Sequence, residues 1–323
     1  MKEINSVLKK KEFKMEEILK KELNTEKVVL LGSSSGGCIN EAKTYETDQG
    51  KIFVKTNTKS GSRKMFDGEY ASLVAIDKVG VVKVPKPYKV IDLPEGGAIF
   101  VMENLDLSQG LSKFASLLGQ QMASLHLHNS KTRQAIAKAE GHIGKTDKLT
   151  YIDKYGFDVP TCCGYIEQCN TWNSDWISFY SNKLESQVTL AESQYGDREV
   201  RELWNTLNPN IHKLFTNVDL EPALLHGDLW SGNAAENSDG PVVYDPASFY
   251  GHSEFDLAIS CMFGGFGQDF FTAYHKVLPK AEGFKLRLDL YKLFHYLNHW
   301  NHFGGGYKSS SVNILKSLIK ATR

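Results

Sequence analysis

The chain has 323 residues, 41% of them hydrophobic, so it is long enough to form two domains with substantial cores. Lysine plus arginine and aspartate plus glutamate both total 38, and this formal charge of zero argues against nucleic acid or an anionic membrane as a partner of the whole chain. The five cysteines lack paired metal-ligand spacing and indicate neither a disulfide framework nor a zinc site.

The N-terminal segment, MKEINSVLKKKEFKMEEILKKEL, carries charges that interrupt every apolar run. The pattern therefore predicts neither a secretory signal nor a membrane span there, and we expect a cytoplasmic protein. Met15, Ile18, Leu19 and Leu23 recur at helical spacing, which predicts an amphipathic surface helix.

Residues 27–56 have the pattern of three adjacent antiparallel strands, VVLLG, CINEAKTYE and KIFVKT, with the turn TDQG between the second and the third. A loop of glycine and serine joins the first two strands, and its backbone amides could approach phosphate oxygens closely. An ordinary hairpin loop would have the same composition, so the loop alone leaves both interpretations open. The candidate phosphate contacts are Gly32, Ser34, Gly36 and Gly37.

Cys38 lies at the end of the same loop. Backbone amides and the nearby Lys55 would favour its thiolate form, so we expect oxidation of Cys38 to suppress activity reversibly. The alternative is an inert small residue in a hairpin. The chain would be a monomer or a homodimer, the latter joined through a Cys38 disulfide.

Lys55 ends the third strand, where protein kinases place the lysine that contacts nucleotide phosphates. Residues 63–79 predict a helix, and Glu69 near its middle is the expected ion-pair partner of Lys55. Such residues are often only solvated, and it is their order after the glycine loop that favours nucleotide binding. The helix should bury its apolar residues, which are Met65, Phe66, Tyr70, Leu73, Val74 and Ile76.

Residues 81–84 and YKVID should continue the sheet, and AIFVMENL should form a last strand that ends at a hinge. By comparison with protein kinases, the carbonyl of Glu103 and the amide of Leu105 would bond the adenine edge, with Met102 behind the ring. The alternative is a buried strand that simply leaves the sheet.

The pattern changes to helices after Asp106, which predicts an N-terminal lobe of residues 1–105 and a C-terminal lobe of residues 106–323. Helices are predicted at 114–129, 176–194 and 197–215, with an exposed connection at 131–155. His126 and His128 lie on different helix faces, which favours packing over metal binding. Three further thiols fit buried small hydrophobes: Cys162, Cys163 and Cys169.

The segment HGDLWSGN at 226–233 carries the strongest functional signal. Protein kinases carry H-R-D-x-x-x-x-N, in which the Asp accepts the substrate hydroxyl proton and the Asn binds magnesium, and a second Asp that chelates metal follows. Asp228, Asn233 and Asp245 occur here in that order. Turn formers at 237–240 predict a hairpin that returns Asp245 to Asn233. We therefore expect Asp228 to be the catalytic base, and Asn233 and Asp245 to be magnesium ligands.

The residues after this motif separate it from protein kinases. Only ten residues separate Asp245 from Asp256, and no APE follows, so the long peptide-docking segment is missing and a small hydroxyl acceptor is favoured. Asp256 should cap or tether the loop. His295, His299 and His302 on one predicted helix invite a zinc interpretation, but the absence of an HExxH pattern favours substrate-facing or packing roles.

Long segments carry a specific resemblance: GGCI at 36–39, FVK at 53–55, LLHGDLWSGN at 224–233, YDPASFYGHSEFDLA at 244–258 and YLNHWNHFG at 296–304. From about residue 16 to residue 318 the chain resembles the fructosamine-3-kinase and ketosamine-3-kinase family. The segments TDQG and TCCGY resemble its fructosamine-3-kinase-related branch.

The resemblance implies an α+β, bilobal protein-kinase-like fold of the aminoglycoside-phosphotransferase type, with an antiparallel-sheet N-lobe and a mainly helical C-lobe. It implies ATP and Mg²⁺ as cofactors, and phosphorylation of the 3-hydroxyl of ketosamines, either small or attached to protein amines. Loss of that phosphate would free the amine, so the reaction would lead to deglycation. Asp228 carries over as the base, Asn233 and Asp245 as metal ligands, Lys55 as a phosphate contact and Trp230 as a substrate platform. The alternative for Trp230 is packing inside the lobe, and the substrate platform would then be sought at His299 or Trp300.

Two other functions stay open. A serine/threonine protein kinase would need the missing docking segment, and an ATP-binding pseudokinase scaffold would be expected to have lost one of Asp228, Asn233 and Asp245. The sequence does not distinguish fructosamines from ribulosamines or psicosamines as acceptors.

Overall fold

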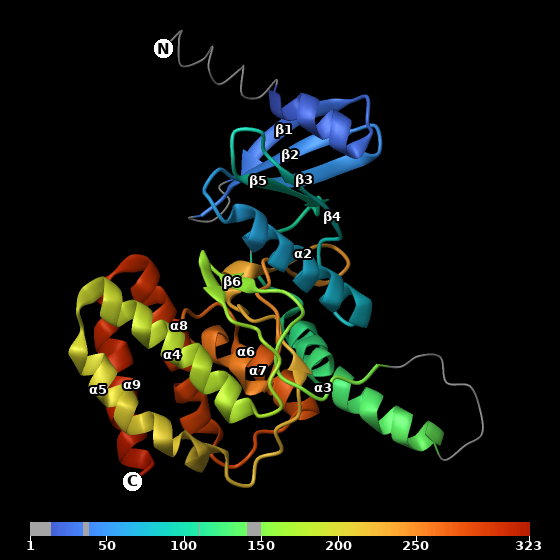
Figure 1. Cartoon of the computed structure of the whole chain (residues 1–323). Helices are drawn as coiled ribbons and strands as arrows, with labels where there is room; N and C mark the ends of the chain where they lie inside the picture. The colour runs from blue at the N-terminus through green and yellow to red at the C-terminus, as the bar shows by residue number, and fades with distance from the viewer. Residues whose placement is uncertain (1–13, 35–38, 109, 141–149) are drawn as a thin grey trace.

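An antiparallel sheet and a mainly helical lobe lie one above the other in the structure, a computed structural model that describes residues 14–34, 39–108, 110–140 and 150–323 (Figure 1). The strands of the sheet are β1 (Val28–Ser34), β2 (Glu41–Thr47), β3 (Gly50–Asn57), β4 (Pro87–Asp92) and β5 (Ala98–Glu103). They are antiparallel neighbours in the order β1-β2-β3-β5-β4. Thr47 pairs with Gly50, which confirms the predicted turn between β2 and β3.

Alternate residues of β5 face helices on opposite sides of the sheet. Ile99 and Val101 join Leu19, from the helix at residues 14–23, in one buried cluster. Phe100 faces α2 (Ser62–Val79), where its ring lies 5.9 Å from that of Phe66. Both predicted helices of this lobe are confirmed.

Two details predicted for this lobe are wrong. Val74 is exposed, because the buried side of α2 runs through Phe66 and Ile76 and faces both the sheet and the second lobe. Residues 81–84 do not join the sheet, since Lys83 forms an isolated bridge with Val242 of the helical lobe.

The second lobe is built mainly from helices. They are α3 (Ala115–Glu140), α4 (Trp176–Tyr195), α5 (Arg198–Leu207), η1 (Asn208–Phe215), α6 (Glu254–Ser260), α7 (Gln268–Val277), α8 (Phe284–Phe303), η3 (Gly305–Tyr307) and α9 (Lys308–Ala321). Short strands pair between them: β6 (Thr161–Cys163) with β7 (Ile166–Gln168), β8 (Ala223–Leu224) with β11 (Tyr250–Gly251), and β9 (Ala234–Glu236) with β10 (Pro241–Val243). The turn η2 (Ser231–Asn233) precedes β9.

Two helix predictions need correction. Residues 131–140 continue α3 rather than opening an exposed connection, because KTRQAIAKAE is rich in good helix formers. The helix predicted at 197–215 is divided into α5 and η1, where a proline near the start of η1 removes a backbone donor.

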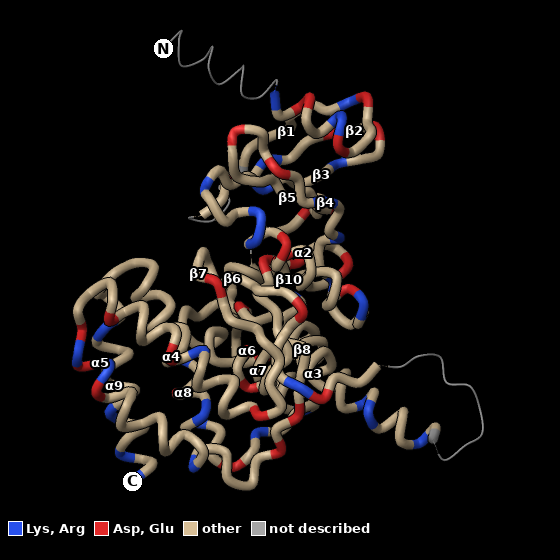
Figure 2. Tube along the Cα trace, in the orientation of Figure 1, with Lys and Arg blue, Asp and Glu red and all other residues tan. Residues whose placement is uncertain are grey.

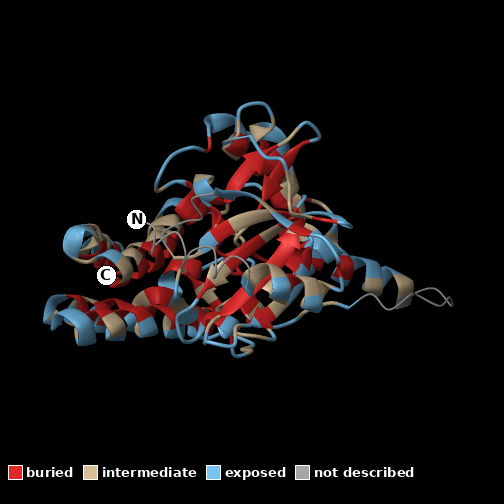
Figure 3. Cartoon of the chain, turned by 90° about the horizontal axis from the view of Figure 1, so that it is seen from above, coloured by how far each residue is buried: buried red, intermediate tan, exposed pale blue. Residues whose placement is uncertain are grey.

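One buried cluster crosses from lobe to lobe and fixes their arrangement. Phe66 and Leu73 of α2 pack with Leu118 and Met122 of α3. The Ser248 N–H in the helical lobe also donates to Ser72 Oγ at 3.1 Å. Buried residues accordingly run through the sheet and along the inner sides of the helices, while their outer sides are exposed (Figure 3).

Charged residues of both signs are spread over both lobes (Figure 2). None of the helices in the described part of the chain has the length and apolar composition needed to cross a membrane. The chain leaves β5 at Glu103 and enters α3 at Ala115, and the domain boundary between residues 105 and 106 stays a proposal.

Candidate active site

A cavity of about 730 Å³ lies between the two lobes. Its floor is formed by the loop before β9 and by residues after β10, and its upper side by β3, α2 and the end of β5. Most of the predicted site residues that the structure describes line it: Lys55, Glu69, Met102, Glu103, Leu105, Asp228, Trp230, Asn233, Asp245 and His299. The folding of the chain therefore brings residues from both lobes to one space.

Other predicted site residues lie elsewhere. Gly32 and Ser34 belong to β1, and Gly32 is not among the described residues that line the cavity. The predicted contacts Gly36 and Gly37 and the predicted redox residue Cys38 lie outside the described residues.

Asp256 holds the loop that carries Asp228. Its buried carboxylate accepts the N–H of His226 at 2.7 Å and the N–H of Gly227 at 2.8 Å. Gly227 has a φ of 84°, and a Cβ there would meet the carbonyl oxygen of Ala247 at 2.1 Å, so only glycine fits. The predicted tethering role of Asp256 is confirmed.

His226 links this loop to the segment that carries Asp245. Its Nδ1 accepts the N–H of Asp228 at 3.3 Å, so the ring proton belongs on Nε2, which donates to the Tyr244 carbonyl oxygen at 3.1 Å. Burial lowers the pKa of His226, which keeps this tautomer neutral. One imidazole thus sets the distance between two predicted catalytic segments.

The predicted hairpin is confirmed. β9 and β10 pair with Ala234 opposite Val243, and the Tyr244 N–H donates to the Asn233 carbonyl oxygen at 3.0 Å. Asp245 follows at once with a φ of 57°, a conformation that residues other than glycine seldom adopt and that clusters at functional sites.

Asp228 sits against Asn233. The Asn233 Nδ2 donates to the Asp228 backbone oxygen at 3.0 Å and to its Oδ2 at 3.2 Å. Burial and then the charge of Asp245 raise the pKa of Asp228 to about 7, and the hydrogen bond from Asn233 opposes this rise. A carboxylate with a pKa near neutrality suits a general base.

Lys55 lies between two carboxylates. Its Nζ is 2.6 Å from Glu69 Oε1 and also contacts Asp245 Oδ1. Burial alone would lower the pKa of Lys55, but Asp245 and Glu69 outweigh it and keep the pKa above its ordinary value. The amine is therefore a fixed positive charge that joins the sheet to the segment after β10.

Rings form one side of the cavity, which we call the aromatic wall: Trp230, Phe263, His299, Phe303 and Tyr307. Trp230 is 37% exposed and meets the edge of Phe263 with ring centroids 6.0 Å apart. Its ring covers Gly232, where a Cβ would come within 2.2 Å of it. Phe263 lies 4.9 Å from His299.

The prediction for Trp300 is wrong. Its side chain is 1% exposed in the core of the helical lobe and stacks on Tyr195 at 5.6 Å, so it does not line the cavity. The residues that sequence reasoning missed are Phe263, Phe303 and Tyr307. Glycines around Phe263 in CMFGGFG were the available signal of a cavity-facing loop.

The histidines of α8 divide into two groups. His299 and His302 line the cavity, and each has its Nδ1 2.7 Å from a carbonyl oxygen of its own helix. His295 lies beneath them, where burial, reinforced by His299, lowers its pKa to about 3. Of the thiols predicted to be buried, Cys163 is buried, Cys162 is half-buried and Cys169 is exposed, which corrects that prediction for Cys169.

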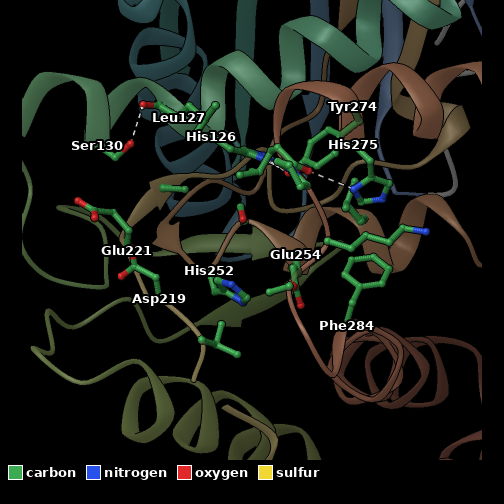
Figure 4. A pocket seen from close by; sticks show the side chains of 18 of the residues that line it. His126, Leu127, Ser130, Asp219, Glu221, His252, Glu254, Tyr274, His275 and Phe284 are labelled. Carbon is green, nitrogen blue, oxygen red and sulfur yellow. Dashed lines mark hydrogen bonds between the residues drawn. The ribbon is translucent and has the colours of Figure 1, made fainter. Parts of the chain in front are cut away.

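A second cavity, of about 270 Å³, opens in the helical lobe, with side chains of His126, His252 and Glu221 around it (Figure 4). His126 connects it to the loop that carries Asp228, because its Nε2 lies 3.0 Å from the carboxylate of Asp256, which holds that loop. This contact agrees with the packing role predicted for His126.

Comparisons with known proteins agree on one family. The family model described as Fructosamine kinase matches residues 11–321. The chain is 52% identical to the ketosamine-3-kinase of Mus musculus, over 95% of this chain and all of that protein. It is 44% identical to the chloroplastic protein-ribulosamine 3-kinase of Arabidopsis thaliana, over 91% of this chain and 83% of that protein.

Solved structures show the same fold. A putative fructosamine-3-kinase from Haemophilus somnus 129PT superposes with a TM-score of 0.76 at 23% identity, covering 94% of this chain and 96% of that one. An aminoglycoside phosphotransferase in ternary complex with AMP-PNP and hygromycin B superposes with a TM-score of 0.53 at 14% identity, covering 95% and 98%. The predicted kinase-like fold is thereby confirmed. On the match of the family model and the identity to these relatives, the chain belongs to the fructosamine kinase family.

Proposed function

We propose that this chain transfers the γ-phosphoryl group of ATP to the 3-hydroxyl of ketosamines. The observation that carries the proposal is the meeting of Asp228, Asn233, Asp245 and the Lys55–Glu69 pair at one cavity. Relatives over most of the chain are named as kinases of ketosamines and of protein-linked ribulosamines. The acceptor would therefore be a ketosamine, either small or attached to a protein.

Asn233 and Asp245 fit the needs of a magnesium ion. The Asn233 Nδ2 is engaged with Asp228, so its side-chain oxygen is the atom available to a metal, and Asp245 supplies carboxylate oxygens. Oxygen donors of these two kinds suit Mg²⁺, which takes few protein ligands beside substrate phosphates. When bound, the ion would neutralise charge on the phosphates of ATP.

The remaining residues position the reactants. Lys55, fixed by Glu69, would contact a phosphate, and the end of β5 at Met102, Glu103 and Leu105 would receive the adenine ring. The sugar would lie on the aromatic wall, with one face against Trp230 and its 3-hydroxyl beside Asp228. Asp228 would accept the hydroxyl proton as the oxygen attacks the γ-phosphorus and ADP leaves.

A turnover assay with a matched panel of acceptors tests this proposal. Fructosamine, ribulosamine and psicosamine derivatives of one amine would be incubated with ATP and magnesium, with ADP release as the rate and phosphorus NMR to locate the phosphate. Phosphorylation at carbon 3 is expected, followed by release of the free amine. Turnover on generic proteins but on none of the ketosamines would instead support a protein kinase. Nucleotide binding without any turnover would support a pseudokinase.

Redox control through Cys38, a disulfide-linked homodimer and a cytoplasmic location stay predictions. Peroxide followed by dithiothreitol should suppress and restore the activity of the wild type but not affect that of Cys38→Ala, and non-reducing gels would reveal a linked dimer. Equal loss of activity in both proteins would remove Cys38 from the explanation.

A further inference from the structure

Three side chains that are good metal ligands meet beneath the aromatic wall. Cys163 comes from β6, Asp228 from the catalytic loop and His295 from α8. The sulfur, one carboxylate oxygen and one imidazole nitrogen all lie within 4.8 Å of one another. No other group of three or more such residues occurs in the part of the chain that the structure describes.

His295 has polar atoms that no described residue uses. Its ring is fully buried, and neither Nδ1 nor Nε2 has a hydrogen-bond partner among the described residues. The ring packs near Phe255 and Phe294, with centroids 4.9 and 5.3 Å away. Buried polar atoms are nearly always satisfied, and an unpartnered one calls for a missing ligand or ion. A neutral imidazole offers a lone pair to a metal ion.

Hydrogen bonds hold the sulfur of Cys163 in place. Asn298 Nδ2 donates to Cys163 Sγ at 3.2 Å, and Asn298 Oδ1 accepts Gln187 Nε2 at 3.2 Å, which fixes the orientation of the amide. Gln187 Oε1 in turn accepts Asn301 Nδ2 at 2.7 Å. An N–H directed at sulfur favours a metal-bound thiolate and is typical behind metal ligands, whereas burial and the charge of Asp228 raise the pKa of the thiol when no metal is bound.

We propose that Cys163, Asp228 and His295 form a binding site for a zinc ion, which inhibits the enzyme by occupying the carboxylate of Asp228. Sulfur, imidazole and carboxylate are the ligand types that zinc prefers, and three protein ligands leave a fourth position open. Bonds of about 2.0–2.3 Å would require the ligand atoms to lie less than about 4 Å apart, so small rotations complete the site. The Cys163 thiol loses its proton to solvent on binding.

The ion reaches this site through the cavity, since Cys163 and Asp228 both line it. Magnesium does not compete there, because it prefers oxygen ligands. The zinc interpretation of the three α8 histidines is thus changed: His295 joins the site, while His299 and His302 belong to the cavity wall. Binding of zinc stands on the geometry alone, whereas inhibition rests on the proposed role of Asp228.

Cobalt spectroscopy tests the binding without measuring activity. The full chain, without an affinity tag and stripped of zinc, would be titrated with Co²⁺ and then with Zn²⁺. We expect one equivalent of tetrahedral Co²⁺ with a thiolate charge-transfer band, displaced by Zn²⁺. Substitution of a residue that only supports a metal ligand usually lowers metal affinity by about 10–100-fold. Cys163→Ser and His295→Phe each remove a ligand and should lower zinc affinity by more than that. Cys163→Ser should also lose the thiolate charge-transfer band. Cys162→Ser is the matched control and should keep both.

The same variants test the inhibition. Micromolar zinc should inhibit ketosamine phosphorylation at saturating magnesium and ATP, and a zinc-selective chelator should restore the activity. The residual activity of Cys163→Ser should not respond to micromolar zinc. A missing thiolate band, or a band that persists in Cys163→Ser, would overturn the proposal. Inhibition that is equal in Cys163→Ser, or that extra magnesium relieves, would place zinc at Asn233 and Asp245 instead. Zinc binding in a protein that phosphorylates no ketosamine would overturn the proposed function and leave the metal site standing.

Discussion

Two sides of the central cavity are built from different kinds of contact. The polar side consists of Lys55, Glu69, Asp228, Asn233 and Asp245, which are joined to one another by ion pairs and hydrogen bonds. Each of these groups depends on the others for its charge and position, so removing one disturbs the whole set. This side would carry the chemistry.

The aromatic wall is held by contacts between rings, and much of it faces solvent. Trp230, Phe263 and Phe303 are 37, 42 and 57% exposed. Rings that pack loosely at the edge of a cavity can be exchanged without unfolding the protein or altering the charges opposite. We infer that substrate choice and phosphoryl transfer can be changed separately in this fold.

The largest effect is expected on the polar side, from Asp228→Ala. Turnover should fall by about 10²–10⁴-fold, because a general base is lost, while nucleotide still binds. Steady-state kinetics with ketosamine and a separate ADP-binding titration measure the two quantities. Asp239→Ala is the matched control, because it removes an exposed carboxylate from the turn between β9 and β10. Near-normal turnover in Asp228→Ala would remove it from the role of base.

A smaller loss is expected from Asn233→Ala and Asp245→Ala. Turnover at fixed magnesium should fall by about 10²–10³-fold, the usual result of removing one electrostatic stabiliser of a transition state. The concentration of magnesium needed for half-maximal rate should rise in both variants. Titrations of magnesium that match the wild type would place the metal elsewhere.

Two tryptophans provide a direct test of the aromatic wall. Trp230→Ala should lower kcat/KM for ketosamine by roughly tenfold, equivalent to about 1.4 kcal/mol, with KM for ATP and the melting temperature nearly unchanged. Trp300→Ala makes the same chemical change in the core and should cost about 3–5 kcal/mol of stability. A large drop in melting temperature for Trp230→Ala, with KM for ketosamine unaltered, would show that Trp230 serves packing.

The same two residues show what sequence could and could not predict. The polar side was predictable because Asp228, Asn233 and Asp245 lie within one short segment and Lys55 and Glu69 in another. His299 and Trp300 were both predicted to face substrate, yet only His299 lines the cavity, and Trp300, about 100° further round α8, packs in the core. Adjacent residues such as Asn298 and His299 do line the cavity together, so the spacing alone did not decide the position of Trp300.

Contacts between distant segments were not predictable. Cys163 and His295 meet only because β6 and α8 pack against the catalytic loop, and no local pattern indicates such a pairing. Val74 was assigned to the buried side of α2 because it is apolar, yet its side chain is exposed. An apolar side chain alone does not indicate which side of a helix will face the sheet and the second lobe.

The smallest effect is expected at Glu236, the last residue of β9, which forms hydrogen bonds with the connection between the two lobes. Its carboxylate accepts the backbone N–H groups of Ser112, Lys113 and Phe114, just before α3. These amides would otherwise be unpaired donors at the start of a helix. The hydrogen bond from the Ser112 hydroxyl and those from the amides lower the pKa of Glu236 to about 2.

A lowered pKa of a carboxylate makes stability depend on pH in one direction. The ionised form is favoured by folding, so its contribution is fully present above the ordinary pKa of about 4.5 and is lost as the pH falls toward 2. Glu236→Gln should therefore unfold at lower urea concentration than the wild type at pH 7, and the difference should shrink steadily between about pH 4.5 and pH 3. Glu202→Gln, at an exposed position of α5, controls for the loss of charge. A difference in unfolding urea concentration that stays constant over this range would show that Glu236 stabilises the fold through the shape of its side chain and not through its charge. The connection between the lobes would then owe its position to the packing of α2 against α3 and to the backbone pairing of Ser108 with Glu236.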